Sequence, residues 1–177
     1  MKKTLAELEN QDVRWEKPSF WKQDFELRAH NGEVIATIRR PRWWSSLAEV
    51  EGVGCRWTFE RKGFWQRRVE IHSVGTGDRA AVFYYNWSGA GRLEYPDGRV
   101  FHWKQGNFWG TKWVWTDETG QPLVGFHTRG GLKLSADISL DAALEDAKAP
   151  TLLIFLGWYL IVKHYEDSSS SVVVVGG

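Results

Sequence analysis

Basic and aromatic residues are interleaved in two short stretches, and this pattern is the strongest chemical signal in the chain. The first stretch runs from Arg39 to Trp44 and the second from Arg61 to Arg68. Arginine binds phosphate oxygens through paired hydrogen bonds, and tryptophan settles at the level of lipid headgroups. The pattern therefore predicts a surface that binds anionic lipid, a membrane surface or another phosphate-bearing partner. The candidate residues are Arg39, Arg40, Arg42, Lys62, Arg67, Arg68, Trp43, Trp44 and Trp65.

The same residues have a plainer interpretation, in which arginine side chains stack over tryptophan on the outside of a β-sheet. Glu60 and Glu70 flank the second stretch and balance part of its charge. From the residues alone this plainer interpretation is favoured, and the lipid site remains the alternative.

The end of the sequence carries a second signal. Gly176 and Gly177 follow four valines, Val172 to Val175, and a serine block, Ser168 to Ser171. This end resembles the C-termini of ubiquitin-like and sulfur-carrier proteins, whose terminal carboxylate is adenylated by an E1-like activating enzyme. Glycine suits a narrow enzyme channel because it has no side chain, the serines would form a flexible tether, and the valines would add a strand to a partner's sheet. The alternative is an ordinary disordered tail.

Residues for catalysis or metal binding are not arranged in any recognisable pattern. The five histidines are scattered, and neither His-x-x-x-His nor Cys-x-x-Cys spacing occurs. Gly75 to Asp78 lacks the helix and the lysine of a phosphate-binding loop, so we expect an ordinary turn there. We expect no catalytic residue, no metal and no cofactor, and hence a protein that is not an enzyme.

Length and charge restrict the remaining classes. The 177 residues suit a single domain, and 23 basic against 22 acidic residues give no electrostatic case for nucleic acid. The single Cys55 fits a reducing compartment, and acidic residues interrupt the N-terminus before any signal peptide forms, so we expect a cytoplasmic protein. The apolar run Leu152 to Val162 covers about 17 Å as a helix, against about 30 Å of hydrocarbon, so no transmembrane segment is expected.

Hydrophobic alternation with a period of two dominates the chain from Phe20 to Ile138, and turn residues recur between the short segments. This pattern predicts ten to twelve short antiparallel strands, with Asn31-Gly32 as a hairpin turn. The apolar run near the C-terminus then needs a sheet to surround it. We therefore expect a mainly β protein, a closed antiparallel β-barrel of about 12 strands that encloses one helix at 151–164. The inward residues that should contact this helix are Trp57, Phe59, Ile71, Trp103, Trp115, Leu134 and Ile138.

Four segments carry a resemblance to a known family: Phe25 to Arg28, Asn31 to Ile38, Leu132 to Ile138 and Leu152 to Val162. Together they resemble the tubby C-terminal and LURP-one-related superfamily, which includes the phospholipid scramblases. The resemblance implies a twelve-stranded barrel around a central C-terminal helix and covers about residues 12–165, between an N-terminal arm at 1–11 and a flexible tail at 166–177. Tubby proteins bind phosphoinositides through basic residues, but no residue-by-residue match to that site is found here.

Two functions are therefore expected from different classes. The first is a non-enzymatic, tubby-like binding module for anionic lipid or another phosphate-bearing partner. The alternative is a ubiquitin-like modifier or carrier whose C-terminal Gly177 is activated by an E1-like enzyme.

Overall fold

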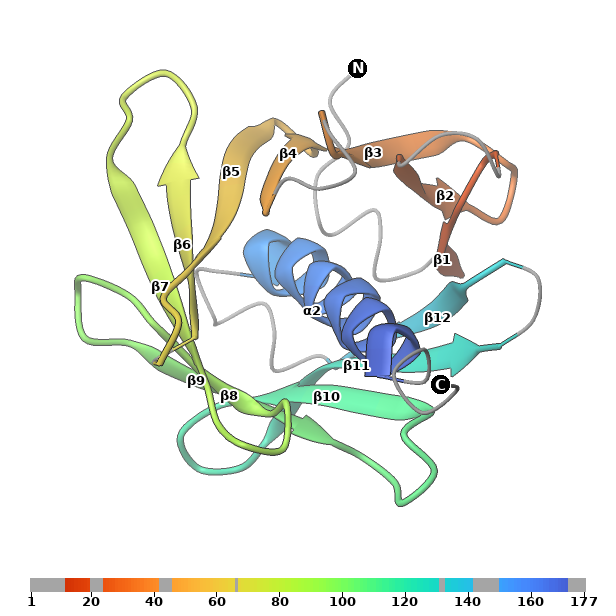
Figure 1. Ribbon diagram of the computed structural model, residues 1–177. Helices are drawn as coiled ribbons and strands as arrows, with labels where there is room; N and C mark the ends of the chain where they lie inside the picture. Colours follow the sequence, from red (N-terminus) through yellow and green to blue (C-terminus); the bar gives the residue numbers. More distant parts are fainter. Residues whose placement is uncertain are drawn as a thin grey trace.

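The computed structural model describes residues 12–19, 24–41, 46–65, 67–130, 133–141 and 150–171. These residues form a closed barrel of twelve antiparallel strands around a long helix, which confirms the expected fold class (Figure 1). The elements are β1 (Val13–Glu16), β2 (Phe25–Ala29), β3 (Val34–Arg39), β4 (Leu47–Gly52), β5 (Cys55–Lys62), β6 (Arg68–Ser73), β7 (Arg79–Tyr85), β8 (Gly91–Glu94), β9 (Val100–Gln105), β10 (Lys112–Thr116), β11 (Pro122–Arg129), β12 (Ser135–Leu140) and α2 (Pro150–Ser171).

The strands form because alternate side chains reach the interior. In β2, Phe25, Leu27 and Ala29 are buried, whereas the side chains between them face outward. Each strand pairs with the next one along the chain, and β1 closes the barrel by pairing with β12, where Val13 lies opposite Ile138. Asn31-Gly32 makes the predicted hairpin turn: Gly32 has a φ of 82°, and its amide donates to the Ala29 carbonyl at 2.9 Å.

Helix α2 fills the barrel, and residues 152–162 are buried throughout. Aromatic rings from the wall pack against it: Trp57 lies 5.7 Å from Phe155 and Phe59 lies 5.5 Å from Tyr159, centroid to centroid. These contacts are among those expected from the alternation. Of the other inward residues, Ile71, Trp103 and Trp115 are buried in the same core, and Leu134 and Ile138 are half-buried against it.

Gly157 lets the helix approach the wall closely. A Cβ atom at this position would lie 2.9 Å from Trp115 Nε1 and would collide with the Phe126 ring. The glycine is therefore required by packing, although it weakens an isolated helix.

The helix is longer than the expected 151–164 and continues through Ser171. The segment expected as a flexible tail from residue 166 is thus helical as far as it is described. Ser168 and Ser169 continue the helix instead of forming a tether. Their hydroxyl groups donate to the carbonyls of His164 and Tyr165, one turn earlier, at 2.8 and 2.9 Å. Residues 1–11 and 172–177 lie outside the described part of the chain.

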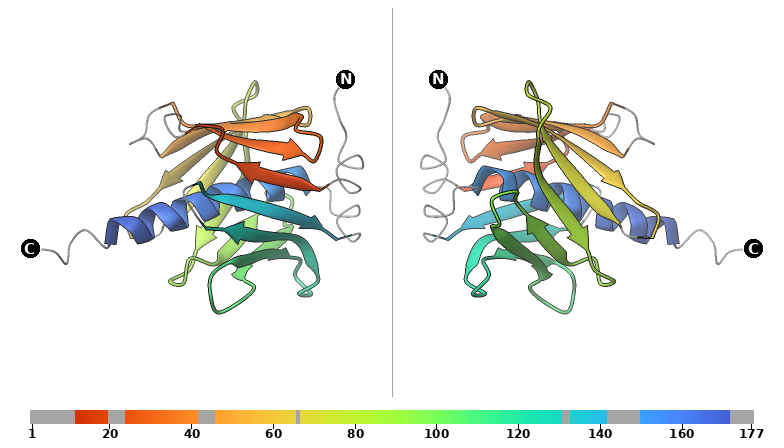
Figure 2. Two further views of the ribbon diagram at one scale, coloured as in Figure 1. Left: turned by 90° about the vertical axis from the view of Figure 1, so that its right-hand side faces the viewer. Right: turned by 90° about the vertical axis from the view of Figure 1, so that its left-hand side faces the viewer.

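Strand direction gives the barrel two distinct ends. Because neighbouring strands are antiparallel, all odd-numbered strands end at one end and all even-numbered strands at the other. The C-terminal half of α2 belongs to the first end, since the Tyr159 hydroxyl donates to the Ser46 carbonyl at 3.0 Å, just before β4 begins. We call this the helix-exit end and the opposite one the turn end; Figure 2 shows α2 passing through the barrel and leaving it on one side.

Candidate functional site

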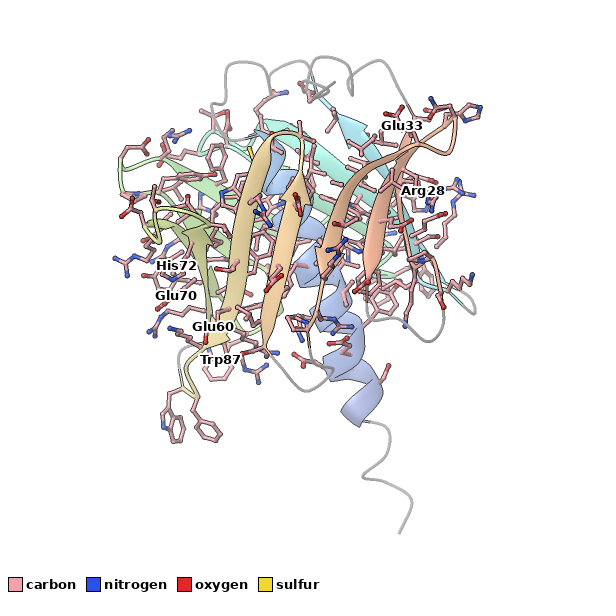
Figure 3. All side chains as sticks on the ribbon, turned by 90° about the horizontal axis from the view of Figure 1, so that it is seen from above. Arg28, Glu33, Glu60, Glu70, His72 and Trp87 are labelled. Atoms are coloured by element: carbon pink, nitrogen blue, oxygen red, sulfur yellow. The ribbon has the colours of Figure 1, made fainter. Side chains whose placement is uncertain are left out.

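Aromatic side chains are exposed at the tips of three hairpins of the helix-exit end. They belong to the connections β5–β6, β7–β8 and β9–β10, and each is between 81% and 106% exposed. Figure 3 shows Trp87 at the end where α2 emerges and Glu33 at the opposite end. Because these exposed apolar side chains gather at one end of the barrel, that end is the candidate interaction surface. We call these residues the aromatic tips: Phe64, Trp65, Trp87, Phe108 and Trp109.

Local hydrogen bonds hold two of these tips in shape. In the β9–β10 connection, Asn107 Oδ1 accepts from the amides of Thr111 and Lys112 at 3.1 and 3.0 Å. In the β7–β8 connection, Asn86 Oδ1 accepts from the amide and the hydroxyl of Ser88. Asparagine makes such turns because its side chain replaces a backbone acceptor. Trp87, Phe108 and Trp109 are therefore presented by ordered turns.

The aromatic rings also occur in pairs. Phe64 and Trp65 meet edge to face with centroids 5.4 Å apart, and Phe108 and Trp109 do the same at 5.6 Å. This geometry is the preferred one for aromatic rings. Each pair forms a compact apolar knob on its hairpin.

Arginine and lysine side chains surround the helix at this end, and α2 supplies their counter-charges. Glu166 pairs with Arg40, which is almost fully buried, and with Lys163, whose Nζ lies 3.1 Å from Glu166 Oε2. Asp167 accepts two hydrogen bonds from Arg61, at 3.0 and 3.2 Å. These pairs fasten the last turns of α2 to the barrel mouth.

The structure separates the predicted basic residues into groups. Arg40 and Arg67 lie at the mouth beside α2, and Arg39 is exposed at the end of β3, opposite Glu49 on β4. Trp65 is one of the aromatic tips. The predicted residues that lie outside the described part of the chain are Arg42, Trp43, Trp44, Gly176 and Gly177.

Lys62 and Arg68 belong to a charge network on the outer wall. Lys62 Nζ lies 3.2 Å from both Glu60 and Glu70, and Arg68 Nε lies 3.0 Å from Glu70. Arg68 and Lys62 hold the pKa of the Glu70 carboxyl below its ordinary value, although burial acts in the opposite direction. His72 Nε2 lies 3.5 Å from the same carboxylate. Carboxylates therefore already balance these two cations.

Sequence reasoning missed most of the aromatic tips and the contribution of α2. A signal was available for the tips, since Trp87, Phe108 and Trp109 stand beside the turn residues Asn86 and Asn107, where polar side chains are usual. No local signal pointed to Arg61 and Asp167, because they meet across 106 positions of sequence.

The turn end has the opposite character. Its five strand-to-strand connections are all described. They carry Glu33, Asp78, Asp97, Asp117 and Glu118 together with one arginine, Arg99, which pairs with Asp97 at 2.8 Å. Asp117 Oδ1 accepts from the Thr119 hydroxyl at 2.7 Å and from the amides of Thr119 and Gln121 at 2.9 Å. These hydrogen bonds, led by the Thr119 hydroxyl, hold the pKa of Asp117 below its ordinary value. The described strand connections of this end are therefore acidic on balance, whereas basic and aromatic groups gather at the other end.

Comparisons with known proteins identify the fold but not a family. No family model matches this sequence, and no curated protein is significantly similar to it. A crystal structure of the Arabidopsis thaliana protein AT5G01750 is similar in fold, with a TM-score of 0.50 and 13% sequence identity. The match covers 82% of this chain and 91% of the plant protein. Within the described residues, none of the helical structure has the length and hydropathy needed to cross a membrane.

Proposed function

We propose that this protein is a non-enzymatic binding module that docks its helix-exit end on an anionic membrane surface. The observation that carries the proposal is the set of five exposed aromatic rings on three successive hairpins of one barrel end. We further propose that the fold is of the tubby-like type, in the superfamily that includes the phospholipid scramblases. The pattern-level resemblance described above supports this assignment.

The expected free energies of binding favour a membrane as the partner of this end. Full burial of a large aromatic side chain contributes about 1.5–3 kcal/mol relative to exposure, and a cation near an anionic leaflet adds about 1 kcal/mol. Tryptophan is also the residue most suited to the headgroup layer, because its ring is apolar and its N–H is polar. Even partial insertion of two ring pairs therefore gives measurable binding.

Charge sets the orientation in this proposal. The helix-exit end combines Arg40, Arg61, Arg67 and Lys163 with the two carboxylates of Glu166 and Asp167, whereas the connections of the turn end are acidic. An anionic surface attracts the first end and repels the second over a distance of about 8 Å at physiological salt. The protein would therefore meet the membrane with its aromatic tips forward.

Vesicle co-sedimentation tests the proposal. Phosphatidylcholine vesicles are compared with vesicles that also contain phosphatidylserine, at about 0.15 M and about 1 M salt, where the Debye length falls from about 8 Å to about 3 Å. We expect binding to the anionic vesicles that weakens at high salt. Replacing Phe64 and Trp65 with serine should weaken it at least about tenfold, the equivalent of 1.4 kcal/mol.

A matched control removes apolar surface from the other end. Val34 and Val74 are the large apolar side chains exposed near the turn end among the described residues, at 42% and 47%. Their replacement with serine should leave vesicle binding unchanged. Equal loss in both variants, or no binding to anionic vesicles at all, would contradict the proposal and favour a protein partner for the aromatic tips.

A further inference from the structure

Asp167 of α2 lies among groups that bind anions. Arg61 donates two hydrogen bonds to its carboxylate, at 3.0 and 3.2 Å, and Arg67 Nη1 lies 3.7 Å away. The Tyr85 amide donates to the Arg67 carbonyl at 3.1 Å, and the Tyr85 phenol lies close enough for the charges of Arg61, Asp167 and Arg67 to act on its pKa. Two guanidinium groups and a tyrosine from β5, β7 and the start of β6 thus meet the end of the helix.

The phenol of Tyr85 is an unused donor in this arrangement. Its hydroxyl is buried and has no hydrogen-bond partner among the described residues. The Arg61 guanidinium lies 5.6 Å from the centre of the Tyr85 ring. Burial raises the pKa of the phenol, so it keeps its proton and remains able to donate. A buried phenol without an acceptor is unusual and calls for an explanation.

A phosphate monoester matches these groups better than a carboxylate does. It has three terminal oxygens and a charge of about −1.5 to −2 at neutral pH, whereas a carboxylate has two oxygens and a single charge. Two guanidinium forks and a phenol supply donors for three oxygens. A phosphate diester, with two terminal oxygens and one charge, offers no such advantage over Asp167.

The position of Asp167 makes it exchangeable. It lies in the last turns of α2, where the helix dipole disfavours a negative charge, and no basic residue follows it within the helix. Its side chain is 49% exposed, and the serines after it are weaker helix formers than alanine or leucine. An anion that binds the arginines more strongly can therefore displace it.

We propose that Arg61, Arg67 and Tyr85 form a binding site for a phosphate monoester, which Asp167 of the protein's own helix occupies in the ligand-free state. The inference rests on the proposed function for the source of the phosphate, which is a lipid headgroup at the membrane surface. Ligand binding exchanges Asp167 for the phosphate and releases the last turns of α2. Asp167 thus lowers the affinity of the site until a monoester competes for it.

The test compares vesicles that contain phosphatidic acid, a monoester, with vesicles that contain phosphatidylglycerol, a diester. The full-length Asp167→Asn variant should bind phosphatidic acid about five- to tenfold more tightly than the natural protein, with a much smaller change for phosphatidylglycerol. Glu166→Gln is the matched control, because it removes the same charge one residue away but pairs with Arg40 and Lys163 instead. It should leave the ratio of the two affinities unchanged.

Two further readouts separate binding from a structural effect. Tyr85→Phe removes only the hydroxyl, so it should leave the stability of the fold unchanged while it abolishes the preference for phosphatidic acid. Hydrogen exchange of residues 163–171 should become faster when the monoester binds, whereas ordinary ligand binding slows exchange. An unchanged preference in Tyr85→Phe, or equal shifts of the affinity ratio in Asp167→Asn and Glu166→Gln, would overturn the inference.

Soluble glycerol 3-phosphate distinguishes failure of the site from failure of membrane docking. If Asp167→Asn binds this probe in calorimetry but no variant binds vesicles, the site stands and the membrane proposal fails. If Asp167→Asn binds vesicles of both types equally and does not bind glycerol 3-phosphate, membrane docking stands and the phosphate site fails.

Discussion

The two ends of the barrel are built from the same strands but are finished in different ways. At the turn end, short connections are closed by their own hydrogen bonds, as Asp117 is with Thr119 and Gln121, and they carry acidic side chains. At the helix-exit end, the connections present aromatic rings to solvent, and charged residues of α2 bind arginines of the mouth. Stability needs only the first kind of end, so the second kind points to a function.

The two halves of helix α2 differ in the same way. Residues 152–162 are buried and complete the core, whereas Lys163, Glu166 and Asp167 make ion pairs at the mouth. One helix thus serves the fold with its first half and the candidate site with its second half. Changes to the two halves should therefore have separable effects.

The largest effect is expected from removing the helix. A chain that stops before Pro150 loses several fully buried side chains, each of which contributes about 1.5–3 kcal/mol, and this exceeds a typical total stability of about 5–15 kcal/mol. We expect loss of soluble expression and of the β-sheet signal in circular dichroism. A chain that stops after Tyr165 keeps the buried half and should fold. A chain without α2 that folds with unchanged stability would remove the enclosed-helix account.

A smaller loss is expected from Gly157→Ala. The added methyl group meets Trp115 and Phe126, and such overpacking costs about 1–3 kcal/mol in the free energy of unfolding. Gly130→Ala is the control, because a Cβ atom there has open space. Denaturant titration should show the difference between the two variants, and the folded Gly157→Ala protein should bind vesicles normally. Loss of vesicle binding without loss of stability would contradict the separation of core and site.

The turn end should respond to acid through Asp117. Its folded-state pKa is lowered by the hydrogen bonds of the turn, so its contribution to stability is complete above the unfolded pKa of about 4 and is lost as the pH falls through the lower folded value. The difference in unfolding temperature between the natural protein and Asp117→Asn should be constant above about pH 5 and shrink below about pH 4. Glu118→Gln removes a charge from the same turn but none of these hydrogen bonds. The difference in unfolding temperature between the natural protein and Glu118→Gln should therefore not show this dependence on pH.

The smallest effect is a gain in stability at the turn between β4 and β5. Val53 has a φ of 51°, which a β-branched residue rarely adopts, and Gly54 follows at 76°. Val53→Asn creates the Asn-Gly pair preferred in such two-residue turns. The relieved strain exceeds the packing that the half-buried Val53 side chain gives up against the core, so the free energy of unfolding should rise by about 0.5 kcal/mol. Val74→Asn, at an exposed position without positive φ, should be close to neutral in the same denaturant titration.

The fold was predictable from sequence because its two signals are local. Period-two alternation marks strands, as in β2, and an apolar run too short for a membrane marks a helix that must be enclosed. Closure of the barrel is different, since the pairing of Val13 with Ile138 joins the first strand to the last and leaves no local signal in the sequence. The length of α2 was underestimated because a serine block resembles a linker, whereas Ser168 and Ser169 bond to carbonyls within the helix.

The site was less predictable than the fold. Antiparallel strands alternate in direction, so Trp65, Trp87 and Trp109 share one end only if the strands between them are counted correctly. A count that is wrong by one strand would move a tip to the opposite end. The pairing of Arg61 with Asp167 depends on where α2 leaves the barrel, and this follows only from the packed structure.

A pair of fluorescent labels tests most directly whether the helix-exit end faces the membrane. In a Cys55→Ser background, Ser88→Cys places a label beside Trp87, and Thr76→Cys places one at the turn end; both positions are exposed. On anionic vesicles that contain nitroxide-labelled lipid, we expect strong quenching and a blue shift for the label at position 88 and neither effect at position 76. Equal quenching at both positions, or stronger quenching at position 76, would contradict the proposed orientation.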